Sequence, residues 1–436
     1  MEKHRTLILE AERYIWKNPE TGWKEFKTSA YMAEQFEKLG YTLTYSEGTT
    51  GFFTVLDTGR PGPEVLILGE LDSIICPEHP EADPNTGAVH SCGHNAQCAT
   101  LLGIAAALKE KGALDELCGR IRLCAVPAEE LLEIEYRREL KRKGIIKYFG
   151  GKVEFLHRGY FDGVDIAFMV HTSDSYAVGK NSVGCIAKNI IYKGTASHAG
   201  GAPWAGCNAL YAATCGLNAA NALRETFKES DFIRFHPIIT RGGDMVNAIP
   251  EVVQAESYVR GISFEAIEHA NKKINRALAG AALSMGANVE IVDIPGYAPL
   301  INSEPFTQLA AKAAEIAIPN QQINTERYVS TGSTDMGDIS CIMPTIHPYA
   351  GGAQGKGHGN DYYIVDPAAA CVDNAKWQLG ILFLLLKDNA AQANQIISDF
   401  TPRFASKEEY LAYVDRFNSS GDRIQYNENG TATVTL

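Results

Sequence analysis

The sequence has no CxxC pair and no short, regular cysteine spacing, although ten cysteines are spread from Cys76 to Cys371. This spacing is unlike a disulfide framework, so we expect reduced, mostly buried thiols. Positive charge is also scarce, because 40 Lys and Arg stand against 52 Asp and Glu, giving a net charge of −12. Nucleic acids and anionic membranes are bound by clustered basic surfaces, so we expect neither as a partner.

Long apolar runs are missing as well, since no uninterrupted run reaches the roughly 18 residues that a membrane-spanning helix needs. Residues 1–20 have the pattern of a charged amphipathic helix, without the apolar centre and cleavage site of a signal peptide. We therefore expect a cytoplasmic protein. Its 436 residues, 45% hydrophobic and 21% charged, predict an ordinary folded chain with at least two domains.

The first part of the chain shows strands that alternate with helices. Helical spacing predicts two helices within residues 3–39 and another at 96–111. Buried strands are indicated by continuous apolar runs at 64–72, 121–130 and 164–174. Alternation of this kind predicts an α/β fold.

The pattern changes at residue 184, where strand, helix, two strands, helix and strand follow in order. This is the βαββαβ arrangement of a ferredoxin-like unit. We therefore predict that residues 184–300 form an inserted domain within a catalytic, metal-binding domain of residues 1–183 and 301–390. Residues 391–436 are expected to form a short helical and turn-rich C-terminal appendage.

Side chains with metal-binding chemistry follow the predicted buried strands. The set at the strand ends comprises Asp72, Glu129, Glu130 and His171. The motif HSCGHN adds Cys92 and His94 just before a helix. Ligands of open α/β sheets bind beyond the carboxyl ends of the strands, so these side chains should converge. A lone histidine or glutamate pair is more often structural, but thiolate, imidazole and carboxylate together favour zinc, with manganese, nickel and cobalt also compatible.

Segments in order along most of the chain resemble a known family. They are NPETGWKE, GELD, HSCGHN, PAEE, VHTSD, SHAGGAPWAGCNAL, GGDMVNAIPE, GSTDMGD and GHGND. The sequence is similar to the metal-dependent amidohydrolases that include aminoacylases, p-aminobenzoyl-glutamate hydrolase and the plant auxin-conjugate hydrolases. The resemblance implies a dinuclear-metallopeptidase-like catalytic domain with an inserted lid or dimerisation domain, in a homodimer or higher homo-oligomer.

The resemblance also implies roles for the strand-end residues. Two divalent cations are implied in each subunit, bridged by the Cys92 thiolate. The other implied ligands are His94, Glu130, His171 and His358. Glu129 resembles a general base that moves a proton from water to the leaving nitrogen. Asp72 is the candidate for orienting a ligand imidazole, and a loop cap is its alternative.

Further site residues are implied in and after the inserted segment. His198 resembles an oxyanion-stabilising residue that enters when the domains close, often from the partner subunit, with a surface histidine as the alternative. Asn247 and Arg260 resemble substrate-binding positions, and a guanidinium suits a carboxylate, although Arg260 could instead be a strand-edge residue. Gly351 and Gly352 would let a substrate approach the backbone.

Three features depart from the family pattern. Asn95 stands where many members have an aspartate, which points to the aminobenzoyl-glutamate-type branch. An insertion at 76–89 adds His79 near the proposed site. A basic insertion at 132–152 is either a solvated helix face or an edge of the cleft that screens substrates.

We expect a metallo-amidohydrolase that hydrolyses an N-acyl amino acid, a dipeptide or an aminobenzoyl-amino-acid amide, a small and carboxylate-bearing substrate. A deaminase of aromatic amines would keep the same metal site. A non-catalytic metal or peptide binder is a third reading, and Glu129 argues against it, because a pure binder needs no base beside a complete ligand set.

Overall fold

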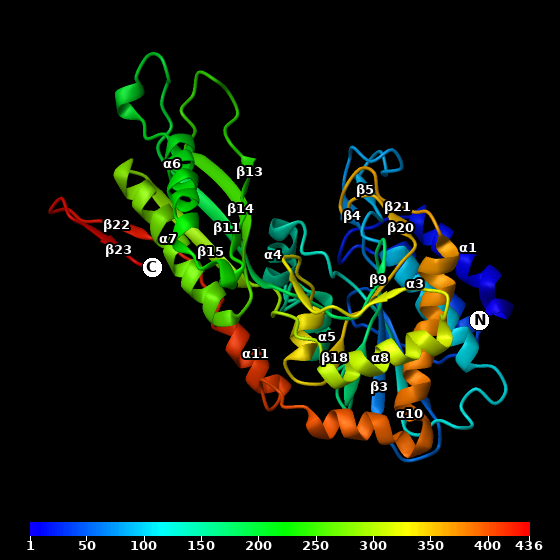
Figure 1. The fold of residues 1–436 in the computed structure, drawn as a ribbon. Coiled ribbons are helices and arrows are strands. Elements are labelled where there is room, and N and C mark those ends of the chain that lie inside the picture. Colours follow the sequence, from blue (N-terminus) through cyan, green and yellow to red (C-terminus); the bar gives the residue numbers. More distant parts are fainter.

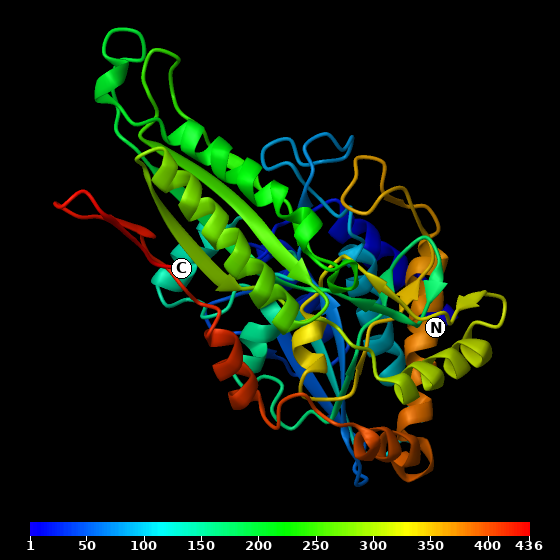
Figure 2. The same ribbon diagram turned by 60° about the vertical axis from the view of Figure 1, so that its left-hand side comes forward.

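The computed structural model describes residues 1–436 and places them around two sheets (Figures 1 and 2). The larger sheet has the strand order β1-β2-β6-β3-β7-β18. Its strands are β1 (Thr44–Tyr45), β2 (Phe52–Asp57), β3 (Glu64–Glu70), β6 (Arg120–Val126), β7 (Ile166–Phe168) and β18 (Thr345–Ile346). Strands β6, β3, β7 and β18 are parallel, so their carboxyl ends meet at one edge.

Helices cover both faces of this sheet, so its central strand β3 is buried throughout. Val65 and Ile67 pack into one core, and Leu66 and Leu68 pack into another. The first core is covered by α1 (Arg5–Trp16), α2 (Phe26–Lys38), α3 (His94–Leu108), α8 (Glu304–Ala317) and α10 (Asn374–Asp399). The second is covered by α5 (Gly151–His157), α9 (Met336–Ser340) and α11 (Lys407–Asp415). The predicted α/β fold is confirmed.

Helix α10, together with the residues before it, is the only segment long and apolar enough to cross a membrane by length and composition. Over Ala368–Asp399, 72% of its most apolar window is buried inside the protein. The Trp377 indole N–H donates to the Ala310 carbonyl of α8 at 2.8 Å. These contacts are those of a core helix.

The smaller sheet is antiparallel, with the order β12-β14-β11-β15 and with β13 also paired to β14. Its strands are β11 (Gly184–Lys193), β12 (Arg234–Phe235), β13 (Ile238–Arg241), β14 (Val252–Gly261) and β15 (Asn288–Pro295). Helices α6 (Ala209–Ala222) and α7 (Phe264–Ser284) pack on this sheet, and both views show the unit projecting from the larger one. Its elements follow the expected βαββαβ order, except that the second expected strand is divided into β12 and β13.

The C-terminal segment ties the two units together. Tyr410 of α11 is buried and donates its hydroxyl hydrogen to Asp338 beneath the larger sheet. The chain then runs along β15, where Asp293 and Ser419 exchange main-chain hydrogen bonds of 2.8 and 3.0 Å. It ends in the hairpin β22 (Ile424–Tyr426) and β23 (Ala432–Val434), drawn in red in Figure 1.

Short strands beyond the carboxyl edge of the larger sheet position the site. Strand β8 (His171–Thr172) pairs in parallel with β19 (Tyr349–Ala350). Strand β10 (Lys180–Ser182) pairs in parallel with β17 (Tyr328–Ser330) and leads directly into β11 of the smaller sheet. Side chains from both units therefore reach this edge.

Candidate metal centre

Five predicted ligands meet at the carboxyl edge of the larger sheet. Cys92 precedes α3, His94 is its first residue, Glu130 follows β6, His171 begins β8 and His358 lies in the loop after β20 (Ala353–Gln354). Gly93, between the first two, has a φ of 89°, and a Cβ there would lie 2.5 Å from the Tyr362 hydroxyl. Glycine therefore permits the turn that brings Cys92 and His94 to the same place.

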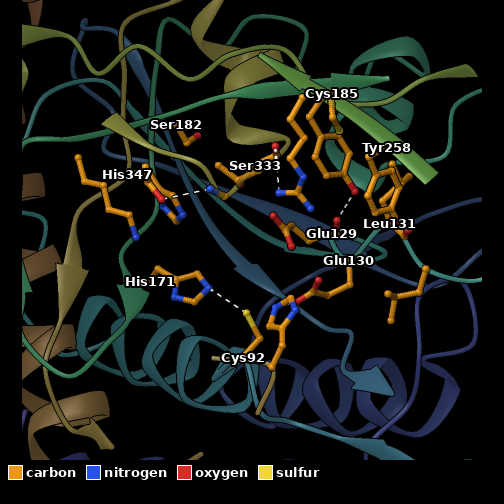
Figure 3. Close-up of a pocket in the computed structure, with 18 of the residues that line it drawn as sticks. Cys92, Glu129, Glu130, Leu131, His171, Ser182, Cys185, Tyr258, Ser333 and His347 are labelled. Carbon is orange, nitrogen blue, oxygen red and sulfur yellow. Dashed lines mark hydrogen bonds and ion pairs between the residues drawn. The ribbon is translucent and has the colours of Figure 1, made fainter. Parts of the chain in front are cut away.

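The ligands form two groups of three that share one thiol. Cys92, His94 and His171 make one group; Cys92, Glu130 and His358 make the other. Within each group the candidate ligand atoms lie within 4.8 Å of one another. Cys92 Sγ is 3.4 Å from His171 Nε2, and His358 Nε2 is 2.9 Å from Glu130 Oε1. The donor set fits two divalent cations, one held by each group, with the Cys92 thiol available to both. Figure 3 shows Cys92 beside His171 and Glu130.

The chemistry of these atoms also suits metal ions. His94 Nε2 and Glu130 Oε1 are buried and make no well-directed hydrogen bond, although each lies at ion-pair distance from another side chain of the site, Glu70 at 3.2 Å and His358 at 2.9 Å. A metal ion bound between these groups would satisfy both atoms. Burial and Glu130 raise the pKa of Cys92, but the imidazoles of His94, His171 and His358 outweigh them and lower it to about 6. A thiolate is therefore available near neutral pH.

Asp72 contacts one residue of each ligand group. One of its carboxylate oxygens is 3.1 Å from His94 Nδ1, and the other accepts from the Glu130 main-chain N–H at 2.7 Å. Asp72 is fully buried. Its contact with Nδ1 leaves Nε2 of His94 to face the other candidate ligands, the arrangement expected of the hydrogen-bonded partner of a ligand imidazole.

Glu129 lies beside the ligands, with its carboxylate 4.0 Å from His94 Nε2. Burial, followed by the Glu70 and Glu130 carboxylates, raises the pKa of Glu129 well above its usual range. The preceding Ala128 has a φ of 56°, a strained conformation for a residue with a Cβ. Glu25, in the NPETGWKE segment, holds this turn by accepting from Ala128 N at 2.8 Å.

A buried ion cluster beneath the ligands has no counterpart among the predicted site residues. Lys152 donates to Glu70 and to Asp335, and all three side chains are fully buried. The second oxygen of Glu70 is 3.2 Å from His94 Nε2. Glu70 ends strand β3, so the rule that placed Asp72 at the site could also have placed Glu70 there.

A cavity of about 220 Å³ opens beside the ligands (Figure 3). Arg260, a candidate substrate-binding residue, lines it together with Lys180 and His347, which the sequence reasoning missed. His347 Nδ1 lies 3.0 Å from the Met169 carbonyl, and burial lowers the pKa of His347 to about 3. This imidazole is therefore neutral, and its place directly after β18 is the signal that could have identified it.

His198 and Asn247 lie together but are not among the residues that line this cavity. Both are exposed, near the outer end of the smaller unit, and Ala199 N donates to Asn247 O at 2.9 Å. His198 Nδ1 accepts from Gly201 N at 2.8 Å. Within one chain, these two residues are separate from the ligands.

Gly351 and Gly352 also do not line the cavity that contains the ligands. They border a second cavity, where a Cβ on Gly351 would lie 2.8 Å from the Tyr176 ring. Gly352 has a φ of 117°, and its Cβ would lie 2.6 Å from Ala370 N. Tight packing explains both glycines without a substrate.

The two insertions support the site from outside. In the first, His79 Nε2 lies 2.9 Å from the Tyr362 carbonyl, which braces the segment after His358. The second contains α4 (Ile134–Arg142), whose Arg137 is buried. Arg137 donates to the carbonyls of Glu130 and Phe149 and so fixes the main chain at Glu130.

Asn95 has a structural partner that explains why it is not an aspartate. Its amide donates to the buried Glu12 carboxylate of α1 at 2.8 Å. An aspartate at this position would place two carboxylates together in the core, which is strongly unfavourable. Asn95 therefore joins α1 to the start of α3, next to His94.

Residues 66–376 match the sequence profile of peptidase family M20/M25/M40. Human Xaa-Arg dipeptidase is 29% identical over 354 residues, covering 77% of this chain and 74% of that protein. One of the p-aminobenzoyl-glutamate hydrolase chains of Escherichia coli K12 is 26% identical over 416 residues, covering 80% of this chain and 88% of that one.

Solved structures share the fold. A putative aminohydrolase from methicillin-resistant Staphylococcus aureus has a TM-score of 0.68 at 22% identity, covering 88% of this chain and 98% of that one. The Bacillus subtilis YXEP protein, described as a dinuclear metal binding peptidase, has a TM-score of 0.62 at 20% identity, covering 88% and 99% of the two chains.

Proposed function

Because the chain belongs to peptidase family M20/M25/M40, we propose that it hydrolyses the amide C–N bond of an N-acyl amino acid, a dipeptide or an aminobenzoyl-amino-acid substrate. Its relatives include proteins named dipeptidase, p-aminobenzoyl-glutamate hydrolase and N-acetyl-L-cysteine deacetylase. The observation that carries the proposal is the pair of ligand groups that share Cys92, with the Glu129 carboxylate beside them.

The residues of this chain divide the work of hydrolysis. Two divalent cations, when bound by the five ligands, polarise the scissile carbonyl and make water more acidic. Glu129 accepts the proton of the attacking water and donates it to the leaving nitrogen, which its raised pKa favours. Asp72 holds His94 and the Glu130 main chain in place during this transfer.

Zinc and manganese are the metals that we propose. A thiolate with imidazoles favours zinc, while the carboxylate of Glu130 also suits manganese. Nickel and cobalt have compatible ligand preferences. All ten cysteines are free thiols, which supports a reducing, cytoplasmic location.

We also propose a homodimer formed through the smaller sheet, with His198 acting on the partner subunit's site. Strand β13 pairs only with β14, so its other edge is free to pair. Apolar side chains are exposed in this unit, including Trp204 (82%), Ile238 (62%) and Val246 (100%). An exposed apolar surface beside a free strand edge fits a contact between copies.

The test is a substrate screen with metal analysis. Purified protein should contain two metal ions per chain and hydrolyse at least one of a panel of N-acyl amino acids, dipeptides and aminobenzoyl amino acids. Aromatic amines without an amide should not be turned over. Metal binding without hydrolysis of any amide, or turnover of aromatic amines alone, would refute the proposed function.

A further inference from the structure

The wall of the cavity away from the metal ligands carries charge of one sign. Apart from Glu129 and Glu130, no acidic residue lines the cavity, but Lys180 and Arg260 do. Hydroxyl groups supply much of the remaining lining: Ser182, Tyr258, Tyr297, Ser330, Ser333, Thr334 and Tyr349. The Tyr258 and Tyr297 hydroxyls donate to the main-chain carbonyls of Leu131 and Glu129. The other hydroxyls lie with two cationic side chains, and such a lining favours an anionic substrate group.

Lys180 enters from β10 and has no carboxylate partner in the protein. The half-buried Lys180 ammonium lies 3.9 Å from the centroid of the Tyr349 ring. That ring is 5.5 Å from the ring of the proposed ligand His171. The buried lysines Lys152 and Lys188, by contrast, each bind a carboxylate of the protein. A positive charge at the site is therefore left for an incoming anion.

Arg260 enters from β14 of the smaller sheet and is held only by neutral groups. Its Nε donates to His236 Nε2 at 3.1 Å, and a terminal nitrogen lies 3.3 Å from Thr331 O and 3.4 Å from Ser333 Oγ. These acceptors fix the guanidinium without neutralising it. The two cationic side chains, Lys180 and Arg260, thus come from different units and line the same cavity.

We propose that Lys180 and Arg260 each bind one carboxylate of a dicarboxylic leaving group, so that the substrate is an N-acylated acidic amino acid. The inference rests on the proposed amide hydrolysis. Arg260 binds the α-carboxylate, whose fixed geometry suits a planar guanidinium, and Lys180 binds the side-chain carboxylate with its flexible stem. A basic leaving group such as arginine would meet two cationic side chains and, apart from Glu129 and Glu130, no acidic one.

The test compares N-acyl glutamate with N-acyl glutamine carrying the same acyl group, because the pair differs only in side-chain charge. We expect wild-type kcat/KM to favour glutamate by about 10- to 100-fold, the worth of a hydrogen bond to a charged group. Lys180→Met should lose this preference through KM, with the glutamine substrate changed by less than about threefold. Lys180→Arg should keep the preference, and Lys147→Met, at an exposed lysine outside the cavity, should behave as wild type.

Arg260→Met should lower kcat/KM for both substrates by similar factors, since both contain the α-carboxylate. Calorimetry provides a readout without turnover: wild type should bind glutamate more tightly than glutamine, and Lys180→Met should not. The inference is overturned, with amide hydrolysis intact, if wild type does not distinguish the two substrates, if Lys180→Met affects both equally, or if arginine dipeptides are preferred. Absence of any amide hydrolysis would instead refute the proposed function.

Discussion

The candidate metal centre and the exposed loops of the smaller unit differ in how their side chains are held. At the candidate metal centre, His94 and Asp72 are fully buried, and each has hydrogen-bond or ion-pair partners from distant segments. At the loops, His198 and Asn247 are exposed, and the His198 imidazole accepts hydrogen bonds only from the main chain of Gly200 and Gly201. The candidate metal centre is assembled within a single chain, whereas the exposed loops present their polar side chains to solvent.

The difference indicates which steps need only folding and which need movement or a second chain. We propose that the buried cluster, whose side chains are hydrogen-bonded to distant segments, is preorganised for metal binding once the chain folds. An exposed histidine contributes to catalysis only after another surface covers it. The variants below separate these two requirements.

The largest effect is expected for a variant at the candidate metal centre. Glu129→Gln removes the proposed base while leaving every ligand, so kcat should fall by about 10³-fold or more with two metals per chain retained. Glu133→Gln is the control, since Glu133 follows in the same loop but binds Lys24 and Thr21 instead. A rate loss below tenfold would assign the proton transfer elsewhere.

The next largest effect is expected for a variant in the exposed loops of the smaller unit. His198→Ala should lower kcat by about 10²-fold, the scale for loss of an oxyanion donor, without loss of metal. Mixing this variant with Glu129→Gln chains should restore activity, because one site of each mixed dimer combines Glu129 from one chain with His198 from the other. Random exchange would give about a quarter of wild-type activity. No recovery in dimers shown to exchange would place His198 in its own subunit's site.

A smaller effect is expected for a variant of Asp72, which contacts two of the proposed ligands. Asp72→Asn keeps the size of the side chain but weakens its hold on His94 and the Glu130 N–H. Metal affinity or activity should fall by about 10- to 100-fold, as for other partners of ligand histidines. Competition with a chelator measures the affinity directly. Wild-type affinity in this variant would show that Asp72 is only a loop cap.

The smallest effect concerns stability beside the site. Burial raises the pKa of Glu12 from 4.5 to about 7, so its contribution to stability is full below about pH 4.5 and is lost as pH rises through about 7. Asn95→Asp should lower the free energy of unfolding by about 2 kcal/mol at pH 8 and by less at pH 5, where Glu12 is protonated. Denaturant unfolding at both pH values measures this, and an equal loss at both would contradict the pairing.

The sequence predicted the fold because its periodicities are strong. The apolar run that became β3 and the βαββαβ order after residue 184 are local signals that need no tertiary information. Part of the candidate site was predictable for a related reason. Glu130 and His171 follow parallel strands of one sheet, whose carboxyl ends converge, and Cys92 and His94 lie where the neighbouring helix α3 begins. The ligand set as a whole, His358 included, came from the resemblance of the motifs.

Residues positioned by irregular segments could not be predicted in the same way. Lys180 faces the cavity because β10 pairs with β17, a contact between segments far apart in the sequence. Arg137 lies in a charged run that looks solvated, yet its guanidinium is buried against main-chain carbonyls. Neither position carries a local pattern that distinguishes it from an ordinary surface lysine or arginine.

The most direct test of the shared thiolate is a cobalt titration of the metal-free protein. Two equivalents of Co²⁺ should bind per chain, and thiolate-to-cobalt charge-transfer absorption should grow through both equivalents because Cys92 belongs to both ligand groups. Cys92→Ser should lose this absorption, while Cys215→Ser, at an exposed thiol, should keep it. Binding of a single equivalent, or charge-transfer absorption that survives in Cys92→Ser, would contradict a dinuclear centre bridged by Cys92.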